Sequence, residues 1–155
     1  MIPLSLYIHF PWCIQKCPYC DFNSHTNNEA LYKPYMETLI DDVTEILPYI
    51  WGRRIHSIFI GGGTPSLMPP PLLESFFTQL RALLGFDPNI EITMEANPGT
   101  VDSSYFQAYR EIGVNRLSIG VQSLNDLQLE KIGRIHSSEE AIKAYEIARR
   151  AGFEN

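Results

Sequence analysis

Three cysteines, Cys13, Cys17 and Cys20, are the residues of this 155-residue chain best suited to metal chemistry. They are its only cysteines, and their C-x3-C-x2-C spacing falls within one short loop. An odd number of crowded thiols does not make a disulfide framework, and such thiols more often hold a metal. In a [4Fe–4S] cluster each thiolate binds one iron, so three thiolates leave the fourth iron open to a small chelating molecule. The loop therefore predicts an iron–sulfur cluster with one free coordination position.

Two other interpretations of the cysteine loop stay open at this point. Soft thiolates also select zinc, and a Cys3His zinc site could take His9 or His25 as its fourth ligand. Structural zinc sites normally pair two C-x2-C knuckles, however, whereas this chain has one compact run. Three unliganded core cysteines are less favoured again, because inert thiols have no reason to cluster on a loop flanked by prolines.

Glycines and polar residues follow the other predicted strands, at the point where each strand ends. Glycine lets backbone approach a ligand closely, and the ligands of parallel α/β folds lie at the carboxyl ends of the strands. Each residue alone is weak evidence, since polar residues at strand ends are usually only solvated. Together they predict one site at one edge, formed by the cysteine loop, residues 61–65 (GGGTP), Glu95 with Asn97, Gln122 with Ser123, and Arg134.

The elements that must position these residues alternate between strands and helices. Short β-branched and aromatic runs predict strands at residues 4–10, 55–60, 90–95 and 116–121. Apolar residues at helical spacing predict intervening helices over 36–47, 72–84, 102–112 and 137–150, with a short turn of helix near 126–132. We expect Pro48 to end the first helix and Gly85 to follow the end of the second. Asp102, and Ser137 with Glu140, are the predicted N-terminal caps of the third and last helices.

Four strand–helix units in this order predict an α/β fold with parallel strands and right-handed crossovers. Residues 1–155 form a single domain, since no linker or composition shift divides the chain. Phe153 resembles the first residue of a fifth strand. Four units do not close a barrel and would leave an unpaired sheet edge. We therefore expect a partial TIM-type (βα)n barrel, the N-terminal part of a longer one.

Composition and charge argue against several classes of partner. The chain carries 12 basic and 18 acidic residues, a net charge of −6, and no basic run, so binding to nucleic acid is not expected. No apolar stretch is long enough for a transmembrane segment, and the first residues lack the positive region of a signal peptide. We expect a cytoplasmic protein. His56 and His136 have no assignable role, and both are expected at the surface.

The motifs together resemble those of the radical S-adenosylmethionine (SAM) superfamily, which combines a C-x3-C-x2-C loop after strand one with GGGTP after strand two. Residues 7–13 (YIHFPWC), 60–66 (IGGGTPS), 95–98 (EANP) and 120–123 (GVQS) are similar to the anaerobic coproporphyrinogen III dehydrogenase family. The similarity is greatest to its haem-chaperone-like (HemW-like) branch and covers essentially the whole chain. This resemblance implies the first four βα units of a radical SAM barrel.

The resemblance also implies a role for each matching residue. The three cysteines would ligate a [4Fe–4S] cluster, whose open iron would chelate the amino and carboxylate groups of SAM. One-electron reduction of the bound sulfonium would give methionine and a 5′-deoxyadenosyl radical. The SAM contacts implied in this way are Tyr7, Tyr19, Gly62, Gly63, Thr64, Glu95, Gln122 and Arg134.

One position departs from the dehydrogenase pattern. Those enzymes have a fourth cysteine two residues after the third, where this chain has Phe22. That departure goes with the chaperone-like branch and argues against porphyrinogen decarboxylation. The resemblance thus implies a haem chaperone, with haem or porphyrin, an electron donor and haem-accepting proteins as partners. The alternatives are oxygen-independent coproporphyrinogen III oxidation and, in another class, a zinc-stabilised binding module.

Overall fold

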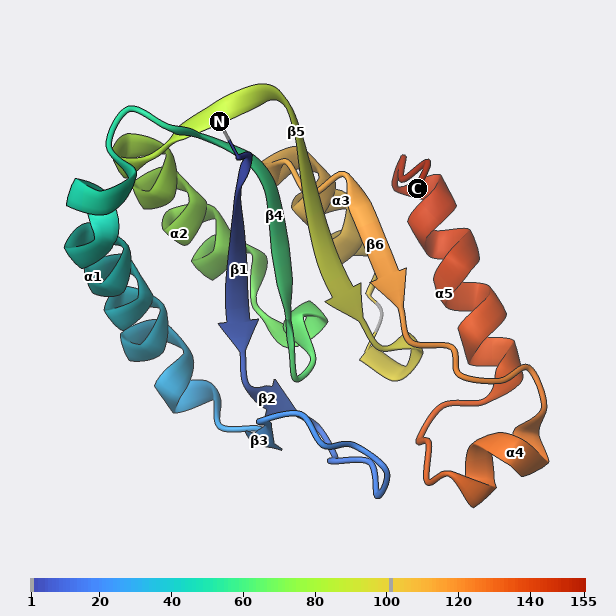
Figure 1. The fold of residues 1–155 in the computed structure, drawn as a ribbon. Helices are drawn as coiled ribbons and strands as arrows, with labels where there is room; N and C mark the ends of the chain where they lie inside the picture. Colours follow the sequence, from blue (N-terminus) through green and yellow to red (C-terminus); the bar gives the residue numbers. More distant parts are fainter. Residues whose placement is uncertain (1, 101) are drawn as a thin grey trace.

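Four parallel strands form one sheet in the computed structural model, which describes residues 2–100 and 102–155 (Figure 1). Their order across the sheet is β1-β4-β5-β6, and every neighbouring pair is parallel. The carboxyl ends of all four therefore meet at one edge, as the arrowheads in Figure 1 show. The predicted parallel α/β arrangement is confirmed. The strands are β1 Leu4–Phe10, β4 Arg54–Gly62, β5 Gly85–Ala96 and β6 Arg116–Ile119.

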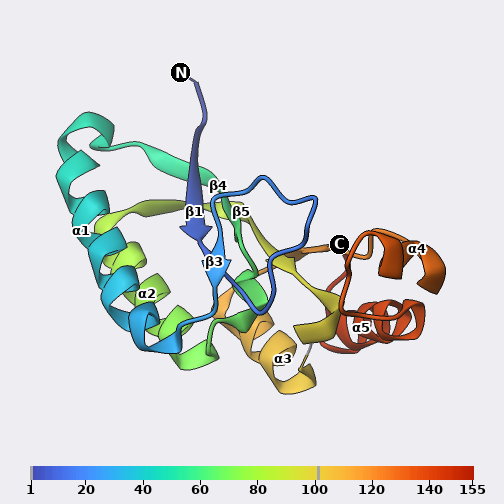
Figure 2. The ribbon, with the colours of Figure 1, turned by 90° about the horizontal axis from the view of Figure 1, so that it is seen from below.

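The longer helices lie along the outer side of this sheet in both ribbon views (Figures 1 and 2). Short 3₁₀ turns at Glu29–Leu31, Pro65–Leu67 and Pro98–Thr100 lie in the connecting segments. No helix in the described part of the chain is long and apolar enough to cross a membrane. The helices are α1 Tyr32–Ile50, α2 Pro70–Leu83, α3 Ser103–Ile112, the short α4 Asp126–Lys131 and α5 Ser138–Arg150.

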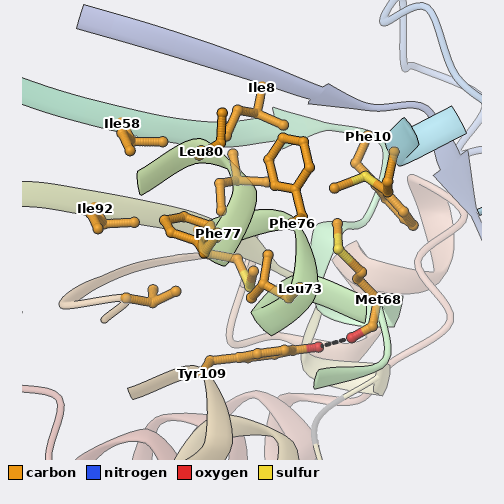
Figure 3. Packing of buried hydrophobic residues seen from close by; sticks show 14 of the residues in the cluster. Ile8, Phe10, Ile58, Met68, Leu73, Phe76, Phe77, Leu80, Ile92 and Tyr109 are labelled. Carbon is orange, nitrogen blue, oxygen red and sulfur yellow. Dashed lines mark hydrogen bonds between the residues drawn. The ribbon is translucent and has the colours of Figure 1, made fainter. Parts of the chain in front are cut away.

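Side chains from neighbouring strands meet α2 in the centre of the core (Figure 3). Ile8, Ile58 and Ile92 come from β1, β4 and β5, and they pack with Phe77 and Leu80 of α2. All five are almost completely buried. Burying each side chain contributes about 1.5–3 kcal/mol relative to leaving it exposed. This packing fixes the three strands relative to one another and so fixes where their carboxyl ends lie.

The predicted helix caps are confirmed. The Asp102 side chain accepts a hydrogen bond from the Ser104 N–H at 2.7 Å. Ser137 Oγ accepts from the Glu140 N–H at 3.2 Å, and the Glu140 carboxylate accepts from the Ser137 N–H at 2.7 Å. This reciprocal pair is the capping box expected from the sequence, and it fixes where α5 begins.

Two predicted boundaries in the first half are wrong. Pro48 lies inside α1, which continues to Ile50, because in the last turn a missing N–H removes only one helical bond. Gly85 follows the end of α2 as predicted, but it does not adopt the left-handed conformation, because it begins β5 opposite Arg54 of β4. β5 therefore starts earlier than predicted. Its pairing with β4 is interrupted at residues 87–90, where the register shifts between Ile55 and Ser57 of β4.

The second half holds further differences. β6 ends at Ile119 because the chain turns at once, with the Val121 N–H bonded to the Ile119 carbonyl at 2.8 Å. Phe153 is buried and lies outside any strand, although the Leu117 N–H donates to the Asn155 carbonyl at 3.1 Å. The surface placement expected for His136 is also wrong. Only 3% of that residue is exposed.

We predict that Tyr109→Phe destabilises the fold. The buried Tyr109 hydroxyl donates to the carbonyls of Met68, at 2.6 Å, and Ser66, at 3.2 Å, and burial raises its pKa (Figure 3). Its loss leaves buried carbonyls without a donor, so the free energy of unfolding should fall by about 1–3 kcal/mol. Urea denaturation of the intact protein measures this. Tyr145→Phe, at an exposed site on α5, is the control, and equal midpoints for the two variants would contradict the prediction.

Candidate cofactor site

The cysteine loop is closed at its base by backbone pairing. After β1 the chain passes through Pro11 into β2 (Trp12–Cys13), and β3 (His25–Thr26) pairs with β2 in parallel. The His25 N–H donates to the Pro11 carbonyl at 2.7 Å, and the Asn27 N–H donates to the Cys13 carbonyl at 2.8 Å. The strand pair was not predicted from the sequence, because each strand has only two residues. It holds the two ends of the loop together beneath the thiols.

The glycine run packs against the start of this loop. The Gly63 N–H donates to the Phe10 carbonyl and the Thr64 N–H to the Trp12 carbonyl, both at 2.7 Å. A Cβ atom on Gly63 would lie 2.5 Å from the Trp12 carbonyl oxygen, which no real side chain allows. Gly62 has a φ of 112°, and a Cβ atom there would lie 2.5 Å from the His9 ring. The glycines are therefore needed for contact between two protein loops, in addition to any contact with a ligand.

Both ring nitrogens of His9 are engaged by the protein. Nε2 donates to the Asn23 carbonyl at 2.8 Å, since a carbonyl can only accept, and Nδ1 lies 3.0 Å from the Tyr7 hydroxyl oxygen. His9 thus braces the cysteine loop and has no free nitrogen for a metal. His25, the other histidine considered as a zinc ligand, is exposed on β3. Neither residue completes a Cys3His site in this arrangement.

Glu95 lies beside the glycine run. Its Oε2 accepts a hydrogen bond from the Gly62 N–H at 3.1 Å. Burial raises the pKa of the Glu95 carboxyl, while this hydrogen bond and the nearby His9 oppose the shift. The backbone N–H of Gly62 thus holds one oxygen of the carboxyl group, which lies on the wall of the cavity described below.

Arg134 connects the cysteine loop to the end of β6. Its Nη1 lies 3.4 Å from Cys17 Sγ and 3.3 Å from the Tyr19 hydroxyl, and its Nη2 donates to the Gly120 carbonyl at 2.6 Å. Its buried Nε has no hydrogen-bond partner among the residues that the structure describes.

These residues line one cavity of about 210 Å³. Eleven residues have a cluster or SAM role implied by the family resemblance, and ten of them lie on its wall, with Tyr7 as the exception. Tyr7 turns its hydroxyl toward His9 and stacks on Phe59, with ring centroids 6.2 Å apart. The ten are Cys13, Cys17, Tyr19, Cys20, Gly62, Gly63, Thr64, Glu95, Gln122 and Arg134.

Several lining residues were not predicted as site residues from the sequence. Ser118 pairs with Glu95 in the register between β5 and β6, so its side chain reaches the wall from within a strand. Gly120 lies where a Cβ atom would be 3.2 Å from Arg134 Nη2 and 3.3 Å from Gln122 Nε2. The position of Gly120 in the GVQS motif was the sequence signal that could have identified it as a site residue. Gln15, Phe22 and Ala96 complete this group, whereas Asn97, which was predicted together with Glu95, is on the wall as expected and Ser123 is not among the lining residues.

The donor set fits an iron–sulfur cluster. All three thiols are free and face the same cavity. Within residues 2–100 and 102–155, no group of three or more His, Cys, Asp and Glu side chains is gathered to hold a metal ion. A cluster binds each thiolate through a different iron, which places its ligands farther apart than the ligands of one zinc ion. In addition, Arg134 places a guanidinium beside Cys17, and its Nε is a buried donor without a hydrogen-bond partner among the described residues.

Comparisons with known proteins agree with this geometry. The chain is 49% identical to the haem chaperone HemW of Escherichia coli over 97% of its own length, and 36% identical to the bovine mitochondrial radical S-adenosyl methionine domain-containing protein 1 over 94%. It spans 40% and 33% of those two proteins. The structure of E. coli coproporphyrinogen III oxidase (HemN), a radical SAM enzyme, superposes on 98% of this chain and 35% of its own, with a TM-score of 0.89 and 29% identity. Residues 7–155 match the radical SAM superfamily, and the chain therefore belongs to that family.

Proposed function

We propose that this chain holds a [4Fe–4S] cluster on Cys13, Cys17 and Cys20 and binds SAM in the same cavity. The observation that carries the proposal is the gathering of three free thiols, a glycine run and the Arg134 guanidinium around one cavity at the carboxyl ends of parallel strands. Membership of the radical SAM family implies this pair of cofactors. The cofactors would together supply one-electron radical chemistry when bound.

The residues of the wall have distinct tasks in this proposal. Arg134 suits a carboxylate, because its planar fork can bind two oxygens. Glu95 and Gln122 offer a carboxylate and an amide to the other polar groups of SAM. Gly62, Gly63 and Thr64 would contact its methionine end, and Tyr19 would flank it. Tyr7 does not reach the wall and would act from a distance through His9, which contacts both Tyr7 and the cysteine loop.

We further propose that the protein handles haem as a chaperone. The support is the similarity to the HemW haem chaperones, together with Phe22 at the position of the fourth cysteine of the dehydrogenases. Haem or porphyrin, an electron donor and a haem-accepting protein are the partners this function requires. A cytoplasmic location fits three thiols that must stay reduced. The chain spans about 40% of the length of these HemW relatives.

We predict that Cys17→Ala abolishes stable cluster assembly. Two thiolates would remain, and the cube would lose one of its three protein ligands. After anaerobic reconstitution with iron and sulfide, metal analysis and visible absorption should show iron in the intact wild-type protein and little in the variant. Asp21→Asn, an exposed change in the same loop, is the matched control and should retain its iron. A fully brown Cys17→Ala protein would show that the ligand assignment is wrong. About one zinc and no iron per wild-type chain would restore the zinc-module alternative.

We predict that Gln122→Ala weakens SAM binding and leaves the cluster in place. Loss of one amide that hydrogen-bonds a charged ligand should raise the Kd for SAM about tenfold. Equilibrium dialysis under anoxia measures the Kd, and iron analysis of the same samples measures the cluster. Gln107→Ala, on the exposed side of α3, removes an amide far from the cavity and should change neither value. Unchanged SAM affinity in Gln122→Ala would remove Gln122 from the binding site.

The chaperone and dehydrogenase functions predict different products. Incubation of the intact, reconstituted protein with coproporphyrinogen III, SAM and a reductant under strict anoxia should leave the porphyrinogen unchanged, whereas haem should bind. Chromatography of the extracted tetrapyrroles measures both. Formation of protoporphyrinogen would overturn the chaperone proposal in favour of oxidative decarboxylation.

A further inference from the structure

His136 is a buried histidine whose role the proposed cofactor site does not explain. It lies in the loop between α4 and α5, two residues after Arg134, and only 3% of it is exposed. Its Nε2 lies 3.1 Å from the Val121 carbonyl oxygen, to which it must donate, and its Nδ1 has no hydrogen-bond partner in the described part of the chain. Burial lowers the pKa of His136, while the hydrogen bond to the Val121 carbonyl opposes the shift.

The segment that His136 contacts has an unusual backbone. Gln122 has a φ of 63°, and among residues 2–100 and 102–155 it is the only residue other than glycine with a positive φ. A side chain disfavours this conformation, which persists only where the surroundings enforce it. The Gln122 side chain nevertheless lies on the cavity wall, with its Nε2 close to Gly120 and to the Arg134 guanidinium.

Two side chains of one loop hold the two carbonyls that precede Gln122. Arg134 donates to the Gly120 carbonyl at 2.6 Å, and His136 donates to the Val121 carbonyl. The loop is braced by the α5 capping box that starts at Ser137, and by Asp126, whose carboxylate accepts from the Ser138 N–H at 2.7 Å. His136 also packs against Gly99, in the turn that follows β5: a Cβ atom added to Gly99 would lie 3.6 Å from His136 Cβ. It is thus wedged between the turns after β5 and β6.

We propose that His136 is a positioning residue for Gln122. By holding the Val121 carbonyl it keeps the backbone of Gln122 at positive φ and the amide on the cavity wall. The inference rests on the proposed function, because it assigns Gln122 a SAM contact. It predicts that a change at His136 affects SAM affinity only through Gln122.

A double-mutant cycle on the intact, reconstituted protein tests the proposal. Removing the donor in His136→Leu should weaken SAM binding about tenfold, since the Val121 carbonyl loses a buried hydrogen bond. In a Gln122→Ala background the same change should have almost no further effect on the Kd, because the side chain it positions is gone. Iron content should stay at the wild-type value throughout. His56→Leu, at the opposite end of the sheet, is the histidine control and should bind SAM like the wild type.

Two polar variants test the same proposal if the leucine variant folds poorly. His136→Gln can place an amide N–H near the position of Nε2 and should bind SAM within about twofold of the wild type, whereas the shorter His136→Asn should bind several-fold more weakly. Wild-type affinity in both His136→Leu and His136→Asn would overturn the inference alone. An equal loss in the wild-type and Gln122→Ala backgrounds would also overturn it. A wild-type protein that carries the cluster but binds no SAM would overturn the SAM proposal itself, and this inference with it.

Discussion

The backbone contact between the glycine run and the cysteine loop is the constraint on which the site depends. Two N–H groups, of Gly63 and Thr64, donate to the carbonyls of Phe10 and Trp12 at 2.7 Å. Only glycine at position 63 lets the backbones come this close, because a Cβ atom would overlap the Trp12 carbonyl. The contact continues the pairing of β1 with β4 past the ends of both strands. The cysteine loop is thereby attached to the sheet, and its position follows from the register of the strands.

Side chains extend this connection across the sheet edge. Glu95, at the end of β5, accepts from the Gly62 N–H, and Ser66 Oγ lies 2.8 Å from Thr100 Oγ1 in the turn that follows β5. Arg134 then joins the end of β6 to the cysteine loop. The carboxyl ends of the strands are thus linked in a ring of contacts around the cavity. Such a site is preorganised by the protein, so binding of a cofactor requires little ordering of the wall.

Much of this arrangement follows from local signals in the sequence, and the rest depends on tertiary contacts. The C-x3-C-x2-C spacing and the strand-end positions of Glu95 and Gln122 predict which residues meet, because parallel strands end at one edge. The burial of His136 was missed, because a loop histidine between two helices carries no periodic signal. Tyr7 points to His9 instead of the cavity, a choice made by one hydrogen bond between neighbouring side chains. The early start of β5 was hidden by Pro88, which interrupts the apolar pattern although the strand continues around it.

Charge is distributed unevenly between the two halves of the cavity. Among the residues that line it, Arg134 is the one cation and Glu95 the one carboxylate, in a chain of net charge −6. Arg134 lies against Cys17, whereas Glu95 is held at Gly62, toward β4. The cavity thus offers one positive and one negative side chain to a ligand that carries both kinds of charge. Arg134 also contacts a predicted cluster ligand, so its replacement would disturb the thiolates and the ligand together. Within the described residues Gln122 makes no hydrogen bond to a thiol, so a change at Gln122 tests the cavity wall separately from the cysteines, whereas a change at Arg134 does not.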